Sequence, residues 1–492
     1  SSWAQASQHV REHCTGPRPC GEMGRSHYVR LHGLVLAACC AANEGLTARA
    51  PAGPSRDVMI NFGDIEYVSY MRVGHQTVNA ILDTGSFETV VFATQCKTCG
   101  QAAKFNPSQS KTHRTGQFMT LHTYGSGETY SLEASDVVSI GSFGEKNLTF
   151  WEVVDAKMSI LKSAEFNAIA GIGPPETPAA DAWTNAQKTL DSVTKYFDDG
   201  KRPPAEVTNS ARDAIDSALE TTKSLTLLDT FGVNTFSMCM GAKPGSDGYV
   251  IWKDTAHKDK PNLFTTVPIL GAHTWSVSLR NVRMQRSGSV TDTKLGCSDE
   301  MGCSALVDSG TSLLAVPKEV LSKIQNLMTE LDADCSRLHE LPNLVFEMGG
   351  GLLSLPPDSY MAEVKGAPPK NLASLNLMRL GPEFQTSVNS TLLREEEEAP
   401  KCKVLLMESY MESEQGPVWV FGMPFFRKYY TTFEVGEDRS SRALHISEAN
   451  DDCFPTERAS LARSRPHAGR VVDIRRVHAP AMLKNFSGRV RL

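Results

Sequence analysis

The sequence predicts a mostly β protein made of two lobes of the same design, and three observations support this. An apolar run ends in Asp83-Thr84-Gly85-Ser86, at residues 80–86. A second apolar run ends in Asp308-Ser309-Gly310-Thr311, at residues 305–312, and repeats that pattern in the other half of the chain. Each copy is followed by a further apolar run, so the chain contains a duplicated module.

Composition supports a globular protein. The chain has 492 residues, 40% of them apolar, which is enough for two or three domains with a sizeable core. The net charge of −6 is unevenly divided, because nine Lys and Arg but only two acidic residues follow Cys453. No aromatic and basic interleaving accompanies this basic end, so we do not expect nucleic-acid binding.

The two carboxylates are the candidate reacting groups. Each ends a strand-like run, and Gly85 or Gly310 allows the sharp turn that follows. Burial would raise the pKa of each Asp, while the hydroxyls of Ser86 and Thr311 can hydrogen-bond the charged form. If the two loops face each other, the carboxylates share one proton, since like charges about 3 Å apart cannot both ionise.

One acid and one base would result from such sharing. The base can take a proton from water while the acid protonates a carbonyl oxygen, which permits peptide hydrolysis with no metal or other cofactor. The alternative is that each Asp only caps a local turn, as single Asp-Thr-Gly or Asp-Ser-Gly tripeptides often do. The duplication favours the first interpretation.

Residues 1–56 are expected to be a signal or targeting segment with a short leader. Residues 34–42 are apolar, follow Arg30 and end in small residues, as a secretory signal does. A short core helix and a lipidated Cys39-Cys40 pair are the alternatives. The run is too short to span a membrane, so we expect no stable membrane span. Order is predicted to begin after residue 56, with a hairpin at residues 66–82 that delivers Asp83.

From about Asn61 to Ser447 the chain resembles the pepsin-like aspartic proteases. The order of landmarks carries the resemblance: both Asp loops, Phe105-Asn106-Pro107-Ser108, Tyr124-Gly125-Ser126-Gly127, and residues 419–422. It implies a bilobal, mostly β fold with a central cleft, an N-terminal lobe at 57–243 and a C-terminal lobe at 244–450. It also implies that Thr84 and Ser309 lock the two Asp loops together.

The same resemblance implies a flap, a mobile hairpin over the substrate, formed by Tyr124, Gly125, Ser126 and Gly127. Glycines at a hairpin tip allow positive φ and close approach to a peptide. An ordinary exposed hairpin is the alternative. Phe166 and Ile169 are expected to line the pocket beside the flap, and residues 166–171 and 419–422 to pack under the two Asp loops.

Disulfides are expected in a secretory context. The resemblance implies the pairs Cys96–Cys99, Cys297–Cys303 and Cys335–Cys402. Half a zinc site or a redox pair is the alternative for Cys96 and Cys99, but no second Cys-x-x-Cys is present. Cys239 and Cys453 both fall near the sheet that joins the lobes, and we predict a fourth disulfide between them. Three glycosylation triplets begin at Asn147, Asn389 and Asn485.

Three segments depart from the resemblance. Helical periodicity predicts an insert of two amphipathic helices within residues 179–228. The apolar positions are Trp183, Ala186, Leu190, Val193 and Phe197 in the first helix and Ala211, Ile215, Ala218 and Leu219 in the second. The insert is interpreted as lobe-surface packing rather than a partner site. Glu395–Glu398 form a solvated acidic loop rather than a metal site. Residues 451–492 form a disordered basic tail, with a sorting or tethering role as the alternative.

Individual residues differ as well. Val90 stands where the family usually has a Trp that hydrogen-bonds the flap Tyr, and Met423 stands where an Asp is common. A long basic prosegment is missing between the candidate signal and the first strand. The conformation of the flap and the control of activation therefore do not follow from the resemblance.

The sequence as a whole predicts a monomeric aspartic endopeptidase that acts on polypeptides in acid, with apolar preference around the scissile bond. Asp83 and Asp308 would be catalytic, in a protein of the secretory pathway that acts in an acidic compartment or outside the cell. The alternative is a catalytically inactive peptide- or protein-binding module on the same fold.

Overall fold

The computed structural model describes residues 53–175, 177–223, 225–271, 274–286, 292–298, 302–331, 335–366, 401–457, 470–479 and 490–491. The expected signal at residues 34–42, the acidic run 395–398 and the triplets at Asn389 and Asn485 lie outside these residues. Asn147 is exposed on a strand. Among the described residues, no helix combines the length and the apolar character needed to cross a membrane.

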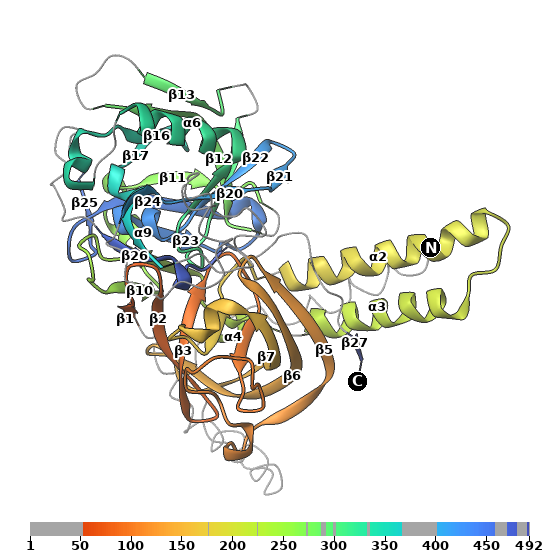
Figure 1. Cartoon of the computed structure of the whole chain (residues 1–492). Helices are drawn as coiled ribbons and strands as arrows, with labels where there is room; N and C mark the ends of the chain where they lie inside the picture. Colours follow the sequence, from red (N-terminus) through yellow and green to blue (C-terminus); the bar gives the residue numbers. More distant parts are fainter. Residues whose placement is uncertain are drawn as a thin grey trace, which may run out of the picture. The chain divides into compact units, whose positions relative to one another are not determined.

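The mostly β fold is confirmed, and its largest sheet has fifteen strands (Figure 1). Its first part consists of β1 (Ser55–Asn61), β2 (Tyr67–Val73), β3 (Gln76–Asp83), β4 (Thr89–Phe92), β5 (Arg114–Tyr124), β6 (Gly127–Ile140), β7 (Lys146–Met158) and β8 (Ala168–Gly171). It continues through β9 (Thr235–Cys239), β10 (Gly248–Trp252), β11 (Thr265–Pro268), β23 (Tyr429–Glu434), β24 (Ala443–Ala449), β25 (Pro455–Thr456) and β27 (Val490–Arg491). The expected lobe boundary at residues 243–244 falls between the paired strands β9 and β10.

The second half of the chain forms a nine-stranded sheet. It contains β12 (Ser276–Gln285), β13 (Asp292–Gly296), β14 (Cys303–Val307), β15 (Leu314–Pro317), β16 (Asn343–Met348), β17 (Gly351–Leu355), β20 (Leu406–Ser409), β21 (Glu412–Ser413) and β22 (Gly416–Phe421). A third sheet has β18 (Met361–Lys365), β19 (Lys401–Val404) and β26 (Val471–Asp473). The strands that end in the two Asp loops are equivalent, because β3 pairs parallel with β8 as β14 does with β22.

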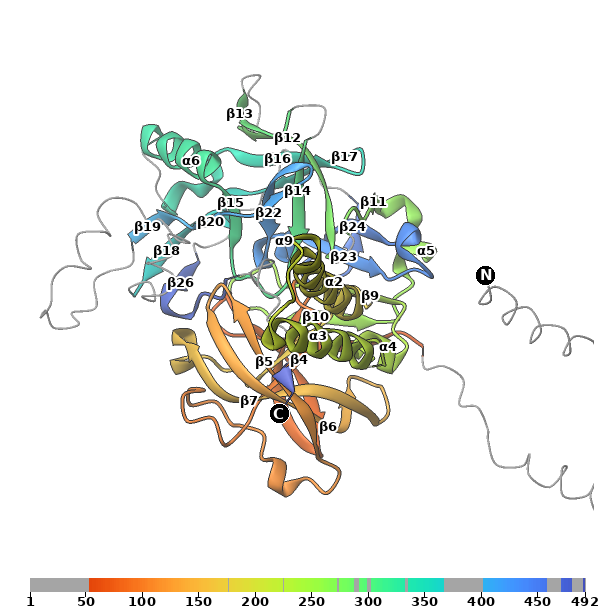
Figure 2. The same cartoon turned by 90° about the vertical axis from the view of Figure 1, so that its right-hand side faces the viewer.

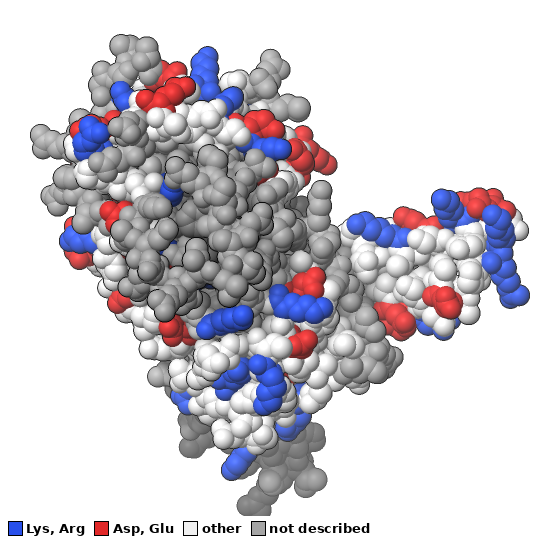
Figure 3. All heavy atoms as spheres, in the orientation of Figure 1, with Lys and Arg blue, Asp and Glu red and all other residues white. Residues whose placement is uncertain are grey.

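The helices are few and mostly short. They are α2 (Thr177–Asp198), α3 (Ala205–Lys223), α4 (Leu227–Phe231), α5 (Ala256–Asp259), α6 (Lys318–Glu330) and α9 (Met423–Lys428). The short 3-10 helix η8 (Ile474–Arg476) follows β26. On the face drawn in Figure 3, basic and acidic side chains are intermingled.

The predicted helical insert is present, but its packing differs from the prediction. Figures 1 and 2 both show α2 and α3 side by side. The buried residues between them are small: Ala182, Ala186, Ala214 and Ala218. The large apolar side chains expected to face inward are 41–61% exposed: Trp183, Leu190, Phe197 and Leu219. Ala186 and Ala218 were among the predicted apolar positions and are buried, because small side chains allow two helices to pack closely.

The prediction of a disordered basic tail is wrong for residues 470–479. This segment forms β26 and η8, and Arg470, Val472, Ile474, Val477, His478 and Ala479 are buried. Residues 455–456 are also ordered, as β25. Residues 470–479 are therefore part of the folded protein.

The described residues contain four disulfides, and they are the four predicted pairs. They are Cys96–Cys99, Cys239–Cys453, Cys297–Cys303 and Cys335–Cys402. The Cys239–Cys453 bond joins β9 to the turn after β24 and closes a sequence separation of 214 residues. It ties the middle of the chain to its C-terminal part.

The lengths of the closed loops predict unequal contributions to stability. In the chain-entropy model, a cross-link stabilises by about 5 kcal/mol at a separation of 214 residues and by about 2 kcal/mol at a separation of 3. We expect Cys239→Ala/Cys453→Ala to lower the free energy of unfolding more than Cys96→Ala/Cys99→Ala, as measured by urea denaturation without reductant. Equal losses, or the reverse order, would contradict this.

Candidate active site

The two Asp loops lie against each other at the ends of β3 and β14. Asp83 is the last residue of β3, and Asp308 directly follows the last residue of β14. Their side chains are 2% and 1% exposed. Each carboxylate is held by its own loop in the same way. Asp83 accepts hydrogen bonds from Gly85 N at 2.9 Å and from Ser86 Oγ at 2.6 Å. Asp308 accepts them from Gly310 N at 2.8 Å and from Thr311 Oγ1 at 2.5 Å.

A reciprocal pair of hydroxyls locks the loops together. Thr84 N donates to Ser309 Oγ at 3.0 Å, and Ser309 N donates to Thr84 Oγ1 at 2.9 Å. Each hydroxyl then donates to the strand of the opposite loop, Thr84 Oγ1 to Val307 O at 2.9 Å and Ser309 Oγ to Leu82 O at 2.5 Å. Both side chains are 1% exposed, so these bonds are shielded from water.

The glycines of the two loops let each carboxylate approach the other loop. A Cβ atom on Gly85 would lie 2.5 Å from Cγ of Asp308, and one on Gly310 would lie 2.6 Å from Cγ of Asp83. Any other residue at either position would push the opposing carboxylate away. The structure therefore brings together all eight residues that the sequence assigned to this centre.

The electrostatics of the centre favour a shared proton. Burial raises the pKa of Asp308 well above its usual range, and the adjacent Asp83 carboxylate raises it further. Hydrogen bonds from Thr311 and Gly310 act in the opposite direction. Asp308 thus retains its proton at a pH where an isolated aspartate has lost it.

Two glycine-containing segments support the loops from below. β8 ends at Gly171, where a Cβ would lie 2.5 Å from Glu88 N and 2.6 Å from Phe87 C. After β22, Gly422 packs in the same way on the second loop, where a Cβ would lie 3.0 Å from Thr311 C. Ile172 N donates to Asp83 O, and Met423 N to Thr311 O. The predicted role of residues 166–171 and 419–422 as loop supports is confirmed.

The predicted flap is the hairpin of β5 and β6. Tyr124 pairs with Gly127 across the turn, and Gly125 and Ser126 form its tip. Gly127 has a φ of +139° and lies against β7, where a Cβ would meet Met158 Cα at 2.8 Å. Burial raises the pKa of Tyr124 well above its usual range, and the charge of Asp83 adds to this, so the phenol stays neutral.

Residues 66–368, more than half of the chain, match the family model for eukaryotic aspartyl proteases. The chain belongs to this family. Cathepsin E-A of Xenopus laevis is 25% identical to this chain over 403 residues, covering 80% of this chain and 81% of the relative. Pepsin A of Bos taurus is 23% identical over 78% of the chain and 86% of its own length. Cathepsin E of Rattus norvegicus is 24% identical over 88% and 90%.

The two expected pocket residues are more buried than pocket walls usually are. Phe166 is 2% exposed and Ile169 0% exposed, and both belong to the apolar cluster that contains Tyr124. Phe166 lies with its ring centroid 5.9 Å from that of Phe92 and 6.0 Å from that of His478. Phe166 therefore contacts the tail segment, while Ile169 packs as a core residue.

Sequence reasoning missed Trp151 and His122, which pack near Tyr124 of the predicted flap hairpin. Trp151 on β7 pairs with Val90, at the position where the family's usual Trp is lacking, and shares the apolar cluster of Tyr124. The His122 ring lies 5.6 Å from Trp151 and 6.5 Å from Tyr124. His122 Nε2 contacts Glu88 Oε2 at 2.7 Å, next to the first Asp loop. Only the pairing of β4 with β7 could have linked Trp151 to this position.

Sequence reasoning also missed His478. This residue is 3% exposed, and its ring centroid lies 6.3 Å from that of the flap residue Tyr124. Burial lowers the pKa of His478, and the charge of Asp83 and the hydrogen bond to Gly310 partly offset this. Nothing in the basic tail sequence indicated a place next to the two Asp loops.

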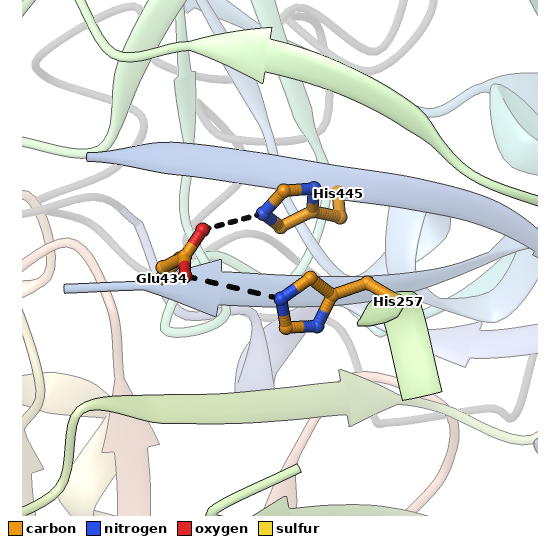
Figure 4. A group of neighbouring side chains, drawn as sticks. All are labelled: His257, Glu434 and His445. Atoms are coloured by element: carbon orange, nitrogen blue, oxygen red, sulfur yellow. Dashed lines mark hydrogen bonds and ion pairs between the residues drawn. The ribbon is translucent and has the colours of Figure 1, made fainter. Parts of the chain in front are cut away.

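A second cluster of titratable groups lies where β23 ends, between that strand, β24 and α5. The donor atoms of His257, Glu434 and His445 all lie within 4.8 Å of one another (Figure 4). Among the described residues, this is a group with the donor types and spacing to hold a metal ion. None of its members belongs to the Asp loops or the flap.

The hydroxyl lock predicts a specific loss of stability. Ser309→Ala removes the partner of two buried backbone groups, Thr84 N and Leu82 O. We expect it to lower the free energy of unfolding by about 2–4 kcal/mol, because each unpaired buried group costs about 1–3 kcal/mol. Ser309→Thr is the matched control, since it keeps the hydroxyl. Urea denaturation measures both, and a Ser309→Ala variant as stable as the parent protein would contradict the account.

Proposed function

We propose that the protein is an aspartic endopeptidase in which a water molecule held between Asp83 and Asp308 attacks the scissile carbonyl carbon. The observation that carries this proposal is the reciprocal approach of the two loops, in which each carboxylate lies against the glycine of the other. Two buried carboxylates in contact provide one acid and one base. Which of them holds the proton at rest is a property of the pair.

The first step of the reaction needs two proton transfers, one from the water to a carboxylate and one from a carboxyl group to the substrate. The ionised carboxylate takes a proton from the water as its oxygen bonds to the carbonyl carbon, and the protonated carboxyl gives its proton to the carbonyl oxygen. A neutral tetrahedral diol results. Proton transfer to the amide nitrogen then accompanies cleavage of the C–N bond, which releases an amine and a carboxylic acid. Ser86 and Thr311 fix the outer oxygens of the two carboxylates, which leaves the inner oxygens for water.

The substrate is proposed to be an extended polypeptide bound under the flap through main-chain hydrogen bonds. Tyr124 and Phe166 provide apolar surface near the centre, which supports a preference for apolar side chains around the scissile bond. The presence of both carboxylates and their hydroxyl partners argues against the inactive binding module. The four disulfides support an oxidising, secretory location.

Asparagine substitutions test the catalytic assignment. Asp83→Asn and Asp308→Asn keep the shape of each side chain but remove its ability to exchange a proton. We expect each to lower kcat/KM by roughly 10²–10⁴-fold on a denatured protein in acid, because general acid–base catalysis contributes about that much. Asp213→Asn, at an exposed position on α3, is the control. Full activity in either dyad variant would refute the assignment.

The raised pKa of Asp308 also predicts a pH dependence of stability. A carboxyl whose pKa is higher in the folded state stabilises the fold in acid, and this contribution is lost as pH rises through the folded pKa. Asp308→Asn removes this pH-dependent contribution to stability. We expect the Tm of the variant, relative to the parent protein, to increase as pH rises from acid to neutral. A pH-independent difference in Tm would contradict the shared-proton account.

A further inference from the structure

The ordered tail segment, residues 470–479, begins beside the second half of the chain. Val471 to Asp473 pair parallel with Glu363 to Lys365 of β18, and Glu363 N donates to Arg470 O at 2.9 Å. Val472, Ile474, Val477 and Ala479 belong to one buried apolar cluster that also contains Ile65 and Leu313. The segment is thus packed along its length rather than laid on the surface.

Two arginines anchor the segment to carboxylates on the body of the protein. Arg470 is 4% exposed; its Nε lies 3.5 Å from Asp64 and one of its terminal nitrogens 3.2 Å from Asp358. Arg476 lies 3.2 Å from Glu66, a residue that is also 4% exposed. Ion pairs buried to this extent are costly to break on one side, because an unpaired buried charge remains. They fix the register of the segment.

The end of the segment lies on the second Asp loop. His478 N donates to Ser312 Oγ at 2.8 Å, and Ser312 N donates back to His478 O at 3.0 Å. The ring donates from Nδ1 to Gly310 O at 2.6 Å. Nε2 of His478 has no hydrogen-bond partner within the described part of the chain. His478 therefore makes three hydrogen bonds to the residues that immediately follow Asp308.

The next residue reaches the flap. Ala479 N donates to Ser126 Oγ at 2.9 Å, and Ser126 at the flap tip is 0% exposed. The His478 ring lies between Tyr124 and Phe166, with centroid distances of 6.3 and 6.0 Å. One short piece of chain thus contacts an Asp loop, the flap and the expected pocket residue at once.

We propose that residues 470–479 are an intramolecular inhibitor that fills the substrate site under the flap, so that cleavage requires this segment to leave. The inference rests on the proposed endopeptidase function. A peptide substrate would need the flap backbone, the surface of Tyr124 and the space beside Gly310 that His478 and Ala479 occupy. Because the segment is covalently attached through residues 458–469, its high effective concentration favours the closed form over a free substrate.

Removal of the segment tests the proposal. A chain that ends at Glu457 is compared with the full chain in kcat/KM for a peptide substrate, and we expect at least a tenfold increase. Arg470→Glu/Arg476→Glu in the full chain should give an increase of the same kind, which keeps the test valid if the shortened chain folds poorly. Arg475→Glu is the matched control, since the Arg475 side chain is 59% exposed. Equal activity of all four proteins would overturn the proposal.

A binding measurement separates this proposal from the catalytic one. A fluorescent peptide of residues 470–479 is titrated into the Glu457-terminated chain that carries Asp308→Asn, where no cleavage is needed. We expect saturable binding that His478→Ala in the peptide weakens at least tenfold. Binding without cleavage by any form of the active-dyad protein would reject the endopeptidase assignment and keep the docking of the tail. No binding would reject the docking itself.

The cluster of His257, Glu434 and His445 supports an independent inference. His445 Nε2 lies 2.9 Å from Glu434 Oε2, and His257 Nε2 lies 3.9 Å from Glu434 Oε1 (Figure 4). The two imidazole rings are stacked with centroids 4.1 Å apart. His257 is 6% exposed, and neither of its nitrogens has a hydrogen-bond partner among the described residues. His257 is thus a buried imidazole without a hydrogen-bond partner, and it lies next to a second imidazole and a carboxylate. All three groups are of types that can ligate a metal ion.

We infer that His257, Glu434 and His445 bind a divalent transition-metal ion such as Zn²⁺. Two imidazoles and a carboxylate are ligands that zinc prefers, with a water completing the tetrahedron. Thr266 Oγ1 lies 3.0 Å from His445 Nδ1 and orients that ring. Lys258 pairs with Glu434 at 3.2 Å, but its side chain is 59% exposed and free to move aside.

Zinc titration of the chelator-treated full chain tests this site. We expect isothermal titration calorimetry to show Zn²⁺ binding that raises Tm and that His257→Ala and His445→Ala each weaken at least tenfold. His339→Ala, at an exposed position 3.8 Å from Glu340, is the matched control. Zinc binding that is absent, or unchanged in both cluster variants, would overturn the inference.

Discussion

The structure depends on the mutual lock of two loops that are far apart in the sequence. Thr84 and Ser309 exchange hydrogen bonds through both backbone and hydroxyl, and each reaches back to the strand behind the other loop. This lock sets the distance between Asp83 and Asp308, while Gly85 and Gly310 leave the space that the carboxylates occupy. The parallel pairs β3–β8 and β14–β22 hold the loops from behind. The proposed chemistry is a consequence of this arrangement, because proton sharing requires contact between two buried carboxylates.

Features that depend on residues close together in the sequence were predictable. An apolar run followed by Asp, a small hydroxyl residue and Gly specifies a strand that ends in a tight turn, and its duplication indicated two equivalent lobes. Tyr124 to Gly127 indicated a hairpin tip. The family resemblance implied three of the disulfides, and the expected position of Cys239 and Cys453 near the sheet that joins the lobes predicted the fourth. Features that depend on partners distant in the sequence were not predictable. Arg470, Arg476 and His478 meet their partners across 112 to 410 residues, and isolated from them the tail has the composition of a solvated segment.

The packing of the helical insert and the position of Trp151 near the flap were also not predictable, because both depend on contacts between separate elements. Periodicity predicted α2 and α3, but it could not decide which apolar face is buried, because a close-packed helix pair is as well served by Ala186 and Ala218 as by larger residues. Trp151 lies beside Val90 only through the pairing of β4 with β7. The proposed inhibitory segment is held by the same physical means as the active centre itself. Its buried charges are paired, and His478 and Ala479 donate hydrogen bonds to Ser312 Oγ, Gly310 O and Ser126 Oγ, which hold the segment in one register.

The central claim is that the two carboxylates titrate as one unit and share a proton. Carbon-13 NMR of aspartate-labelled protein measures this directly, with Asp83→Asn and Asp308→Asn used to assign the two resonances. The account predicts that one carboxyl of the pair stays protonated at a pH where the exposed aspartates are ionised, and that either substitution changes the titration of the remaining partner. Two resonances that both titrate with the exposed aspartates, each unaffected by the other substitution, would contradict it.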